Sequence, residues 1–269
     1  MTDSGKWWDN PWNPVCGCKP ASEGCANCYA RRLHDQRHAA WAVGRWPGAP
    51  ACYQRPFPEV QLFYGGMDKP MHWRKPREIF CCNMGDLLHE EVPDGFLDCV
   101  FGIMNLCQQH RFYVCTKRAE RLPKYFDTDN REHAIAHAGM VQSGGNWKLC
   151  DLPLRNVMLM VTAENQARAN ERIPLLLRTP AAMRGVSVEP MLGPVDLASA
   201  AGVTWWDDPS AGLKWVVCGG ESGQGARPMN PDWARALRDQ CREAGIPFWF
   251  KQMSGRAEIP ADLRVREKA

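Results

Sequence analysis

Short apolar runs alternate with polar, helix-forming stretches along most of this 269-residue chain. The runs are rich in β-branched and aromatic residues and occupy residues 78–82, 111–115, 156–161, 183–188, 213–218 and 246–250, with a further short strand expected at 12–15. Continuous apolar runs separated by helices are typical of a parallel sheet that is buried on both faces. The pattern therefore predicts an α/β fold with seven parallel strands, in a partial or complete parallel β/α barrel of the TIM type.

The length of the chain suits a single domain of this kind with loop insertions. We expect the barrel to span residues 1–255, with a helix at about 29–43, and a polar tail to follow at 256–269. Clusters of proline, glycine and polar residues predict irregular insertions at about 44–78 and 127–151. The first insertion is expected to cover the open end of the barrel.

Polar residues follow almost every predicted strand. In a barrel of parallel strands the active site forms at the carboxyl ends of the strands, where the variable loops begin. Capping of the next helix is the alternative role for any one of these residues. The candidates are Asn83, Asp86, Lys117, Arg118, Glu164, Glu189, Gly219, Gly220, Glu221, Lys251 and Gln252.

A loop at residues 12–29 contains four closely spaced cysteines, Cys16, Cys18, Cys25 and Cys28. A structural zinc site usually takes four ligands from two separated Cys-x-x-Cys pairs, whereas this loop has only one such pair. An iron–sulfur cube held by three thiolates leaves one iron open for another ligand. We therefore expect Cys18, Cys25 and Cys28 to bind the metal, with Cys16 as a spare thiol or an alternative to Cys18.

The loop resembles that of the radical S-adenosylmethionine (SAM) enzymes. The chain is similar, over most of its length, to a family of small, often phage-encoded proteins that are interpreted as divergent radical SAM members. That resemblance rests on Trp12-Asn-Pro, on the Cys-x6-Cys-x2-Cys-Tyr spacing, and on Gly219-Gly-Glu-Ser-Gly and Phe250-Lys-Gln. Well-studied radical SAM enzymes more often have Cys-x3-Cys-x2-Cys with an aromatic residue before the last cysteine, where this chain has Asn27.

The resemblance implies an enzyme with a [4Fe-4S] cluster on the three cysteines and SAM on the open iron. Such an enzyme takes an electron from an external donor, cleaves SAM to a 5′-deoxyadenosyl radical and removes a hydrogen atom from its substrate. The residues implied for SAM binding are Asn83, Asp86, Glu164, Glu189, Gly219, Gly220 and Glu221. The residues implied for the substrate are Lys117, Arg118, Lys251 and Gln252.

The distribution of charged residues indicates a class of substrate. The formal charge of +3 does not indicate nucleic-acid binding by itself, but arginine and lysine gather with tryptophan within residues 31–77, including Trp73 and Arg74. Arginine beside tryptophan can neutralise phosphate and stack on a base, although a solvated helix face is an equally simple interpretation. We expect a nucleotide or a base of nucleic acid, such as phage DNA in a modification pathway, as substrate. The alternative function is a zinc-stabilised nucleic-acid-binding module without catalysis.

The thirteen cysteines are odd in number and many lie in apolar runs, which indicates buried thiols in a reducing compartment. No apolar run is long enough for a membrane span, and no signal peptide is expected. We therefore expect a cytoplasmic protein, in the host cytoplasm if phage-encoded. His34 and His38, one helical turn apart, are expected on the surface of the first helix.

Overall fold

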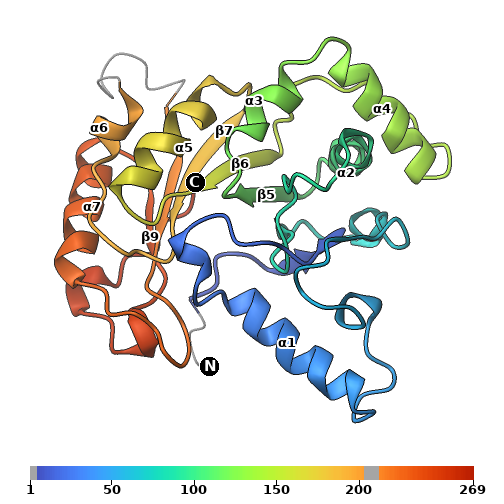
Figure 1. The fold of residues 1–269 in the computed structure, drawn as a ribbon. Coiled ribbons are helices and arrows are strands. Elements are labelled where there is room, and N and C mark those ends of the chain that lie inside the picture. Colours follow the sequence, from blue (N-terminus) through green and yellow to red (C-terminus); the bar gives the residue numbers. More distant parts are fainter. Residues whose placement is uncertain (1–4, 203–211) are drawn as a thin grey trace. The chain divides into compact units, whose positions relative to one another are not determined.

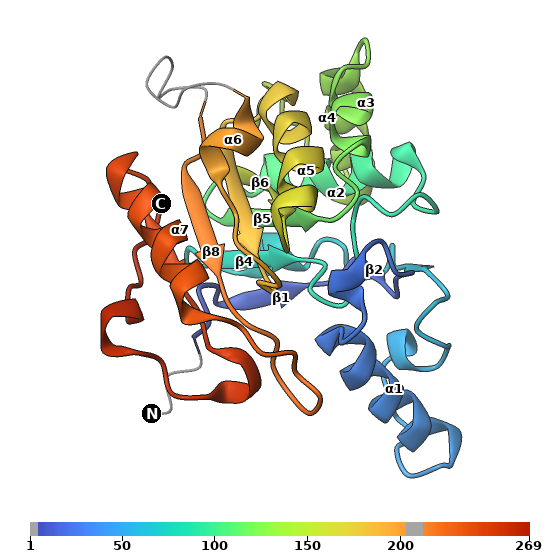
Figure 2. The same ribbon diagram turned by 60° about the vertical axis from the view of Figure 1, so that its left-hand side comes forward.

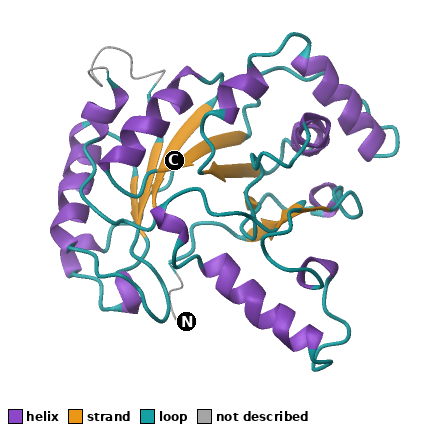
Figure 3. Cartoon of the chain, viewed as in Figure 1, coloured by secondary structure: helices purple, strands orange, loops and turns teal. Residues whose placement is uncertain are grey.

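The computed structural model describes residues 5–202 and 212–269. Helices, strands and loops alternate along the chain in a mixed α/β fold (Figures 1 and 3). Seven strands follow the hydrogen-bonded order β1-β4-β5-β6-β7-β8-β9. Their bounds are β1 (Asn10–Trp12), β4 (Glu78–Cys81), β5 (Arg111–Thr116), β6 (Val157–Thr162), β7 (Met183–Val188), β8 (Trp215–Cys218) and β9 (Phe248–Phe250).

Every apolar run predicted from the sequence corresponds to one of these strands. The expected first strand begins two residues earlier than predicted, at Asn10. The α/β class and the parallel sheet are confirmed, while the strand order describes a sheet with two ends and does not show a complete barrel.

The chain divides into two compact units, and strand β5 contributes residues to both. The first unit comprises Met1–Trp7, Cys115–Asp127 and Met158–Ala269. The second unit comprises Trp8–Val114 and Thr128–Val157. The boundary predicted at residue 255 coincides with neither unit and stays a prediction.

The second unit contains strands β1 and β4, most of β5, and the cysteine loop. Trp12, Cys81 and Val114 lie level with one another in register at the carboxyl side of these strands. Short strands pair antiparallel beside them, and three-residue or four-residue 3-10 turns interrupt the loops. The remaining elements are α1 (Tyr29–Ala42), α2 (Asp94–Leu106), α4 (Arg131–Gln142), β2 (Val15–Cys16), β3 (Gln61–Leu62), η1 (Glu23–Cys25), η2 (Ala51–Tyr53) and η3 (Lys69–His72).

The two predicted insertions have different structures. Residues 44–78 are irregular apart from η2, β3 and η3, as the prolines predicted. Residues 127–151 contain α4, a helix that the sequence analysis missed, and α4 packs closely on α2. A Cβ atom placed on Gly102 of α2 would lie 2.5 Å from the Cα atom of Gly139 of α4, so the two glycines allow the backbones to approach.

The first unit contains β6 apart from Val157, and β7 to β9, with helices along one face of these strands (Figure 2). Every residue of β6, β8 and β9 is buried, which explains why these strands appear as continuous apolar runs in the sequence. The helices and 3-10 turns are α3 (Arg121–Phe126), α5 (Gln166–Arg178), α6 (Leu197–Ala201), α7 (Pro231–Glu243), η4 (Ser254–Arg256) and η5 (Ala261–Leu263). Within the described residues, no helix combines the length and the apolar character needed to cross a bilayer.

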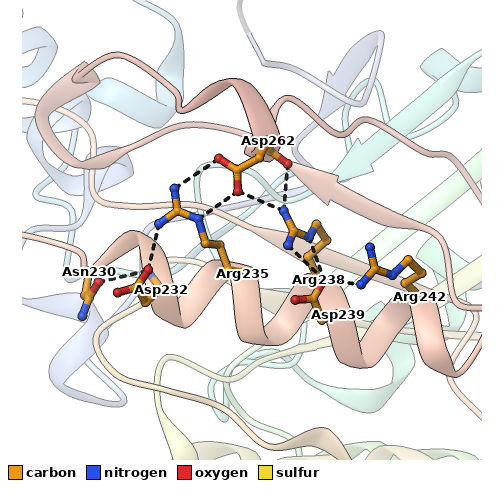
Figure 4. A network of polar contacts seen from close by, with 7 residues as sticks. All are labelled: Asn230, Asp232, Arg235, Arg238, Asp239, Arg242 and Asp262. Atoms are coloured by element: carbon orange, nitrogen blue, oxygen red, sulfur yellow. Dashed lines mark hydrogen bonds and ion pairs between the residues drawn. The ribbon is translucent and has the colours of Figure 1, made fainter.

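The polar tail at 256–269 is attached to the first unit. Leu263 is fully buried, and the backbone N–H of Phe250 donates to the carbonyl oxygen of Val265 at 2.9 Å. Arg235 and Arg238 of α7 both bind the carboxylate of Asp262 (Figure 4). The tail therefore forms part of the folded unit despite its polar composition.

Candidate functional site

The cysteine loop is held by close backbone contacts within the second unit. The N–H of Gly17 donates to the carbonyl oxygen of Met84 at 3.0 Å. A Cβ atom on Gly17 would lie 2.3 Å from the carbonyl oxygen of Glu59, and the φ of Gly17 is +90°. Only glycine accepts both the left-handed conformation and the close approach. The irregular insertion therefore packs directly against the cysteine loop.

The segment after β4 lies against the same loop, as its position at a strand end predicted. The hydroxyl of Tyr29 donates to the carbonyl oxygen of Asn83 at 2.7 Å. The side-chain Oδ1 of Asn83 is buried and has no hydrogen-bond partner in the part of the chain that the structure describes. Asp86 is held in a local turn, because its Oδ1 accepts from the N–H of Leu88 at 3.0 Å, and it caps no helix, since α2 begins only at Asp94.

The four loop cysteines differ in burial and contacts. Cys16 is fully buried, and its Sγ donates to the carbonyl oxygen of Cys52 at 3.8 Å. A hydrogen bond with Cys52, followed by burial, raises the pKa of Cys16 above its usual range, and the same pairing lowers the pKa of Cys52 to about 7. The three predicted metal ligands are partly exposed and form no disulfide: Cys18, Cys25 and Cys28.

The donor set of this loop suits an iron–sulfur cluster chemically. Three partly exposed thiols come from one loop, and the Sγ of Cys25 accepts from the backbone N–H of Ala21 at 3.4 Å. Hydrogen bonds to sulfur are one means by which proteins adjust such clusters. Among the described residues, no three cysteine, histidine, aspartate or glutamate side chains are grouped closely enough to hold a metal ion. The metal assignment therefore stays a prediction.

In the first unit, Glu164 at the end of β6 is completely buried. Its Oε2 accepts from Nη1 of Arg172 at 2.9 Å, and Nζ of Lys117 lies 3.8 Å from its Oε1. The same Nη1 of Arg172 donates to the carbonyl oxygen of Thr162 at 2.7 Å. The sequence analysis missed Arg172, whose position on α5 gave no sign that its side chain turns back to the strand end.

Glu189, Gly219 and Lys251 come together at the ends of β7, β8 and β9. Oε1 of Glu189 lies 2.9 Å from Nζ of Lys251, and Oε2 accepts from the hydroxyl of Ser187 at 3.4 Å. A Cβ atom on Gly219 would lie 3.2 Å from Oε1 of Glu189 and 3.3 Å from Cβ of Lys251. Because Gly219 has no side chain, the ion pair between Glu189 and Lys251 fits beside it. The side chain of Glu189 is 16% exposed, in contrast to the buried Glu164.

The remaining candidate residues at the strand ends of the first unit form hydrogen bonds with the loops around them. The amide of Gln252 donates to the carbonyl oxygen of Gly220 at 3.0 Å, and a Cβ atom on Gly220 would lie 2.4 Å from the backbone nitrogen of Ser254. Glu221 accepts from the backbone N–H of Arg227 at 2.8 Å and from its Nε at 3.0 Å. The glycine-rich loop is therefore closed by an internal ion pair.

Three further polar residues have defined surroundings. Arg118 is buried, and its backbone N–H donates to the hydroxyl of Thr116 at 2.9 Å, while the expected contact of its side chain with the substrate stays a prediction. Asn165 caps α5 by accepting from the N–H of Arg168 at 3.1 Å. The expected surface position is wrong for His34, which is fully buried with Nε2 2.7 Å from a backbone carbonyl oxygen.

Trp73 lies beside the amino-terminal edge of the sheet in the second unit. Its ring centroid is 6.0 Å from that of His110, and the guanidinium of Arg77 lies 5.4 Å from its centroid. Arg77 and His110 directly precede the first residues of β4 and β5. The cysteine loop follows the opposite, carboxyl ends of these parallel strands. The expectation that the first insertion places Trp73 over the carboxyl end is therefore wrong.

These features define an α/β protein with a cysteine loop in one unit and glutamate–lysine pairs at the strand ends of the other. The chain belongs to a family described as protein of unknown function (DUF5131), whose model matches residues 3–268. No curated protein and no solved structure matches it.

Proposed function

We propose that this protein is a radical SAM enzyme whose [4Fe-4S] cluster is held by Cys18, Cys25 and Cys28. The observation that supports the proposal is the division among the loop cysteines, since three are partly exposed and Cys16 is buried. When bound, the cluster would supply the electron that cleaves SAM to a 5′-deoxyadenosyl radical. The proposal includes a partial β/α barrel, an external electron donor and a cytoplasmic location.

The chain's own residues would bind and orient the reactants. The buried Oδ1 of Asn83, beside the cysteine loop, is an acceptor suited to the ammonium group of SAM. In the first unit, Glu189 and Lys251 remain proposed polar contacts for a hydroxyl or amino group. Glu164 forms a buried ion pair with Arg172, so in this proposal it has a positioning role and does not contact SAM itself.

The experiment that tests the metal centre is anaerobic reconstitution with iron and sulfide. Cys18→Ala, Cys25→Ala and Cys28→Ala are expected to lose iron and sulfide, whereas Cys16→Ala retains both. Cys99→Ala, which changes another partly exposed thiol of the same unit, is the matched control. Electron paramagnetic resonance of the reduced protein, with and without SAM, would show whether SAM reaches the cluster.

Two results would contradict the proposal in different ways. Loss of the cluster in Cys16→Ala but not in Cys18→Ala would refute the ligand assignment. Stoichiometric zinc without sulfide in anaerobically purified protein would instead support the non-catalytic zinc module. That module would need Cys16 as its fourth loop ligand, although Cys16 is buried against Cys52.

The proposed substrate is a nucleotide or a base of nucleic acid. Lys251 is paired with Glu189, whereas Lys117 shares Glu164 with Arg172, so one positive charge is left over at these strand ends of the first unit. This charge suits a phosphate of the nucleotide or nucleic acid. A base inside a duplex must be extruded before it can enter a protein pocket, so single-stranded substrates are expected to react faster.

A further inference from the structure

We infer that Cys52 is an oxidation site, at which a hydroperoxide forms a sulfenic acid that Cys16 then converts into a disulfide. Both residues belong to the second unit, and Cys52 follows Cys16 by 36 positions in the sequence. Cys52 lies in η2 of the irregular insertion, and Cys16 ends β2 in the cysteine loop. The inference uses only these two thiols, so it does not depend on the proposed radical SAM activity.

The two thiols are in contact and are held there by several side chains. Sγ of Cys16 donates to the carbonyl oxygen of Cys52 at 3.8 Å, and the two thiols are also hydrogen-bonded to each other. Nε2 of His34 lies 2.7 Å from the same carbonyl oxygen, and the amide of Gln61 donates to it at 3.2 Å. Side chains from α1, β2 and β3 therefore fix Cys52 beside Cys16 before any oxidant arrives.

The two thiols differ in their access to solvent, and this difference assigns their roles. Cys52 is partly exposed, whereas Cys16 is fully buried in a cluster that includes Tyr53, Phe57 and Met84. A dissolved oxidant therefore reaches Cys52 first. A sulfenic acid that forms beside a second thiol condenses with it to a disulfide, and redox-sensing cysteines often have such a partner. Cys16 has the position of that partner.

The surroundings of Cys52 favour its thiolate, which is the form that attacks a peroxide. The hydrogen bond with Cys16 and, more weakly, the positive charge of Arg37 lower the pKa of Cys52. The guanidinium of Arg37 lies 4.9 Å from the ring centroid of Tyr53, and its Nη1 donates to the hydroxyl of the same residue. Because Tyr53 directly follows Cys52 in the chain, these contacts keep the cation near the thiol.

The reaction uses one hydroperoxide for each disulfide. The thiolate of Cys52 attacks the terminal oxygen, the O–O bond breaks, and the leaving oxygen takes up a proton and departs as water or an alcohol. The thiol of Cys16 then attacks the sulfur of the sulfenic acid, so that an S–S bond forms and water leaves. The two sulfur atoms are oxidised and the peroxide is reduced. A dithiol reductant reverses the change by thiol–disulfide exchange.

The test treats the full chain with hydrogen peroxide, alkylates the remaining thiols and maps disulfides by mass spectrometry. A linked peptide that joins Cys16 to Cys52 is expected, and a dithiol reductant should separate its halves. Cys16→Ala should lose this link and accumulate sulfenic acid at Cys52, which dimedone traps. Cys18→Ala changes a partly exposed thiol of the same loop and should retain the link.

A link to Cys52 that survives in Cys16→Ala and disappears in Cys18→Ala would overturn the role of Cys16. Absence of both the link and a dimedone adduct at Cys52 would overturn the oxidation site. Equal dimedone labelling of Cys52 and Cys99 in Cys16→Ala would also overturn it, because Cys99 is another partly exposed thiol of this unit. Mapping of the link in the unchanged protein requires no variant to fold, and circular dichroism shows whether Cys16→Ala retains its fold.

Discussion

Glu164 and Glu189 are both carboxylates at strand ends, yet their surroundings give them different roles. Glu164 is completely buried and bound to the buried Arg172, whereas Glu189 and Lys251 are partly exposed. Removal of one partner from a buried ion pair leaves an uncompensated charge, which costs much more than loss of a partly exposed pair.

Glu164→Ala is therefore expected to lower the free energy of unfolding by about 3–5 kcal/mol. Glu189→Ala is expected to lower it by about 1 kcal/mol, because water solvates the remaining Lys251. Urea denaturation of both variants measures the difference. Equal losses would show that Arg172 finds another partner when Glu164 is removed.

The proposed contact with SAM gives Glu189→Ala a second expected effect. If Glu189 binds SAM, this variant retains its fold and its iron but binds SAM about tenfold more weakly, as loss of a charge-assisted hydrogen bond predicts. Equilibrium dialysis against labelled SAM with reconstituted protein measures this change. Unchanged affinity would leave Glu189 with only its ion pair to Lys251.

At the scale of elements, contact between α2 and α4 depends on two facing glycines. Gly102→Ala is expected to lower the free energy of unfolding by about 1–3 kcal/mol, because its Cβ would press on the backbone of Gly139. Gly95→Ala in the same helix is the matched control, since a Cβ there meets no atom within 4 Å. The control should be neutral or more stable, because alanine favours helix. Similar losses in both variants would contradict this account.

The attachment of the tail to α7 is expected to depend on pH. Hydrogen bonds from Arg235 and then Arg238 lower the pKa of Asp262 to about 2, from its ordinary value near 4 (Figure 4). A carboxyl group with a lowered pKa stabilises the fold above its unfolded pKa, and this contribution is lost as the pH falls through the folded pKa. The attachment should therefore weaken between about pH 4 and pH 2.

Nuclear magnetic resonance titration of the Asp262 carboxyl checks this expectation. Arg235→Gln should move the midpoint upward, toward the ordinary value. Arg242→Gln is the control, because Arg242 binds Asp239 and not Asp262 (Figure 4). An unchanged midpoint in Arg235→Gln would show that another group keeps Asp262 ionised.

At the scale of the whole molecule, a formal charge of +3 permits only moderate attraction to nucleic acid. Binding of single-stranded DNA by the cluster-loaded protein is expected to weaken steadily between about 50 and 200 mM salt, since bound phosphates release counterions. Filter binding or fluorescence anisotropy measures the slope. An affinity independent of salt, or no binding at all, would leave a small metabolite or a peptide as the substrate.

The sequence by itself determined the strands, the first helix and the polar residues that end the strands. Burial on both faces requires nearly continuous apolar side chains, so β6 could be recognised from its own residues. A polar residue between a strand and the next helix, such as Asn165, is also a cap candidate on local grounds, because a cap acts on amides only a few residues away. Such signals lie within one segment of the chain.

Only the tertiary structure decided which partner each polar side chain meets and how deeply it is buried. Arg172 binds Glu164 because α5 folds back on its strand, and His34 is buried because the irregular insertion covers it. These contacts join segments that are distant in sequence or meet only after packing, and neither composition nor periodicity contains that information.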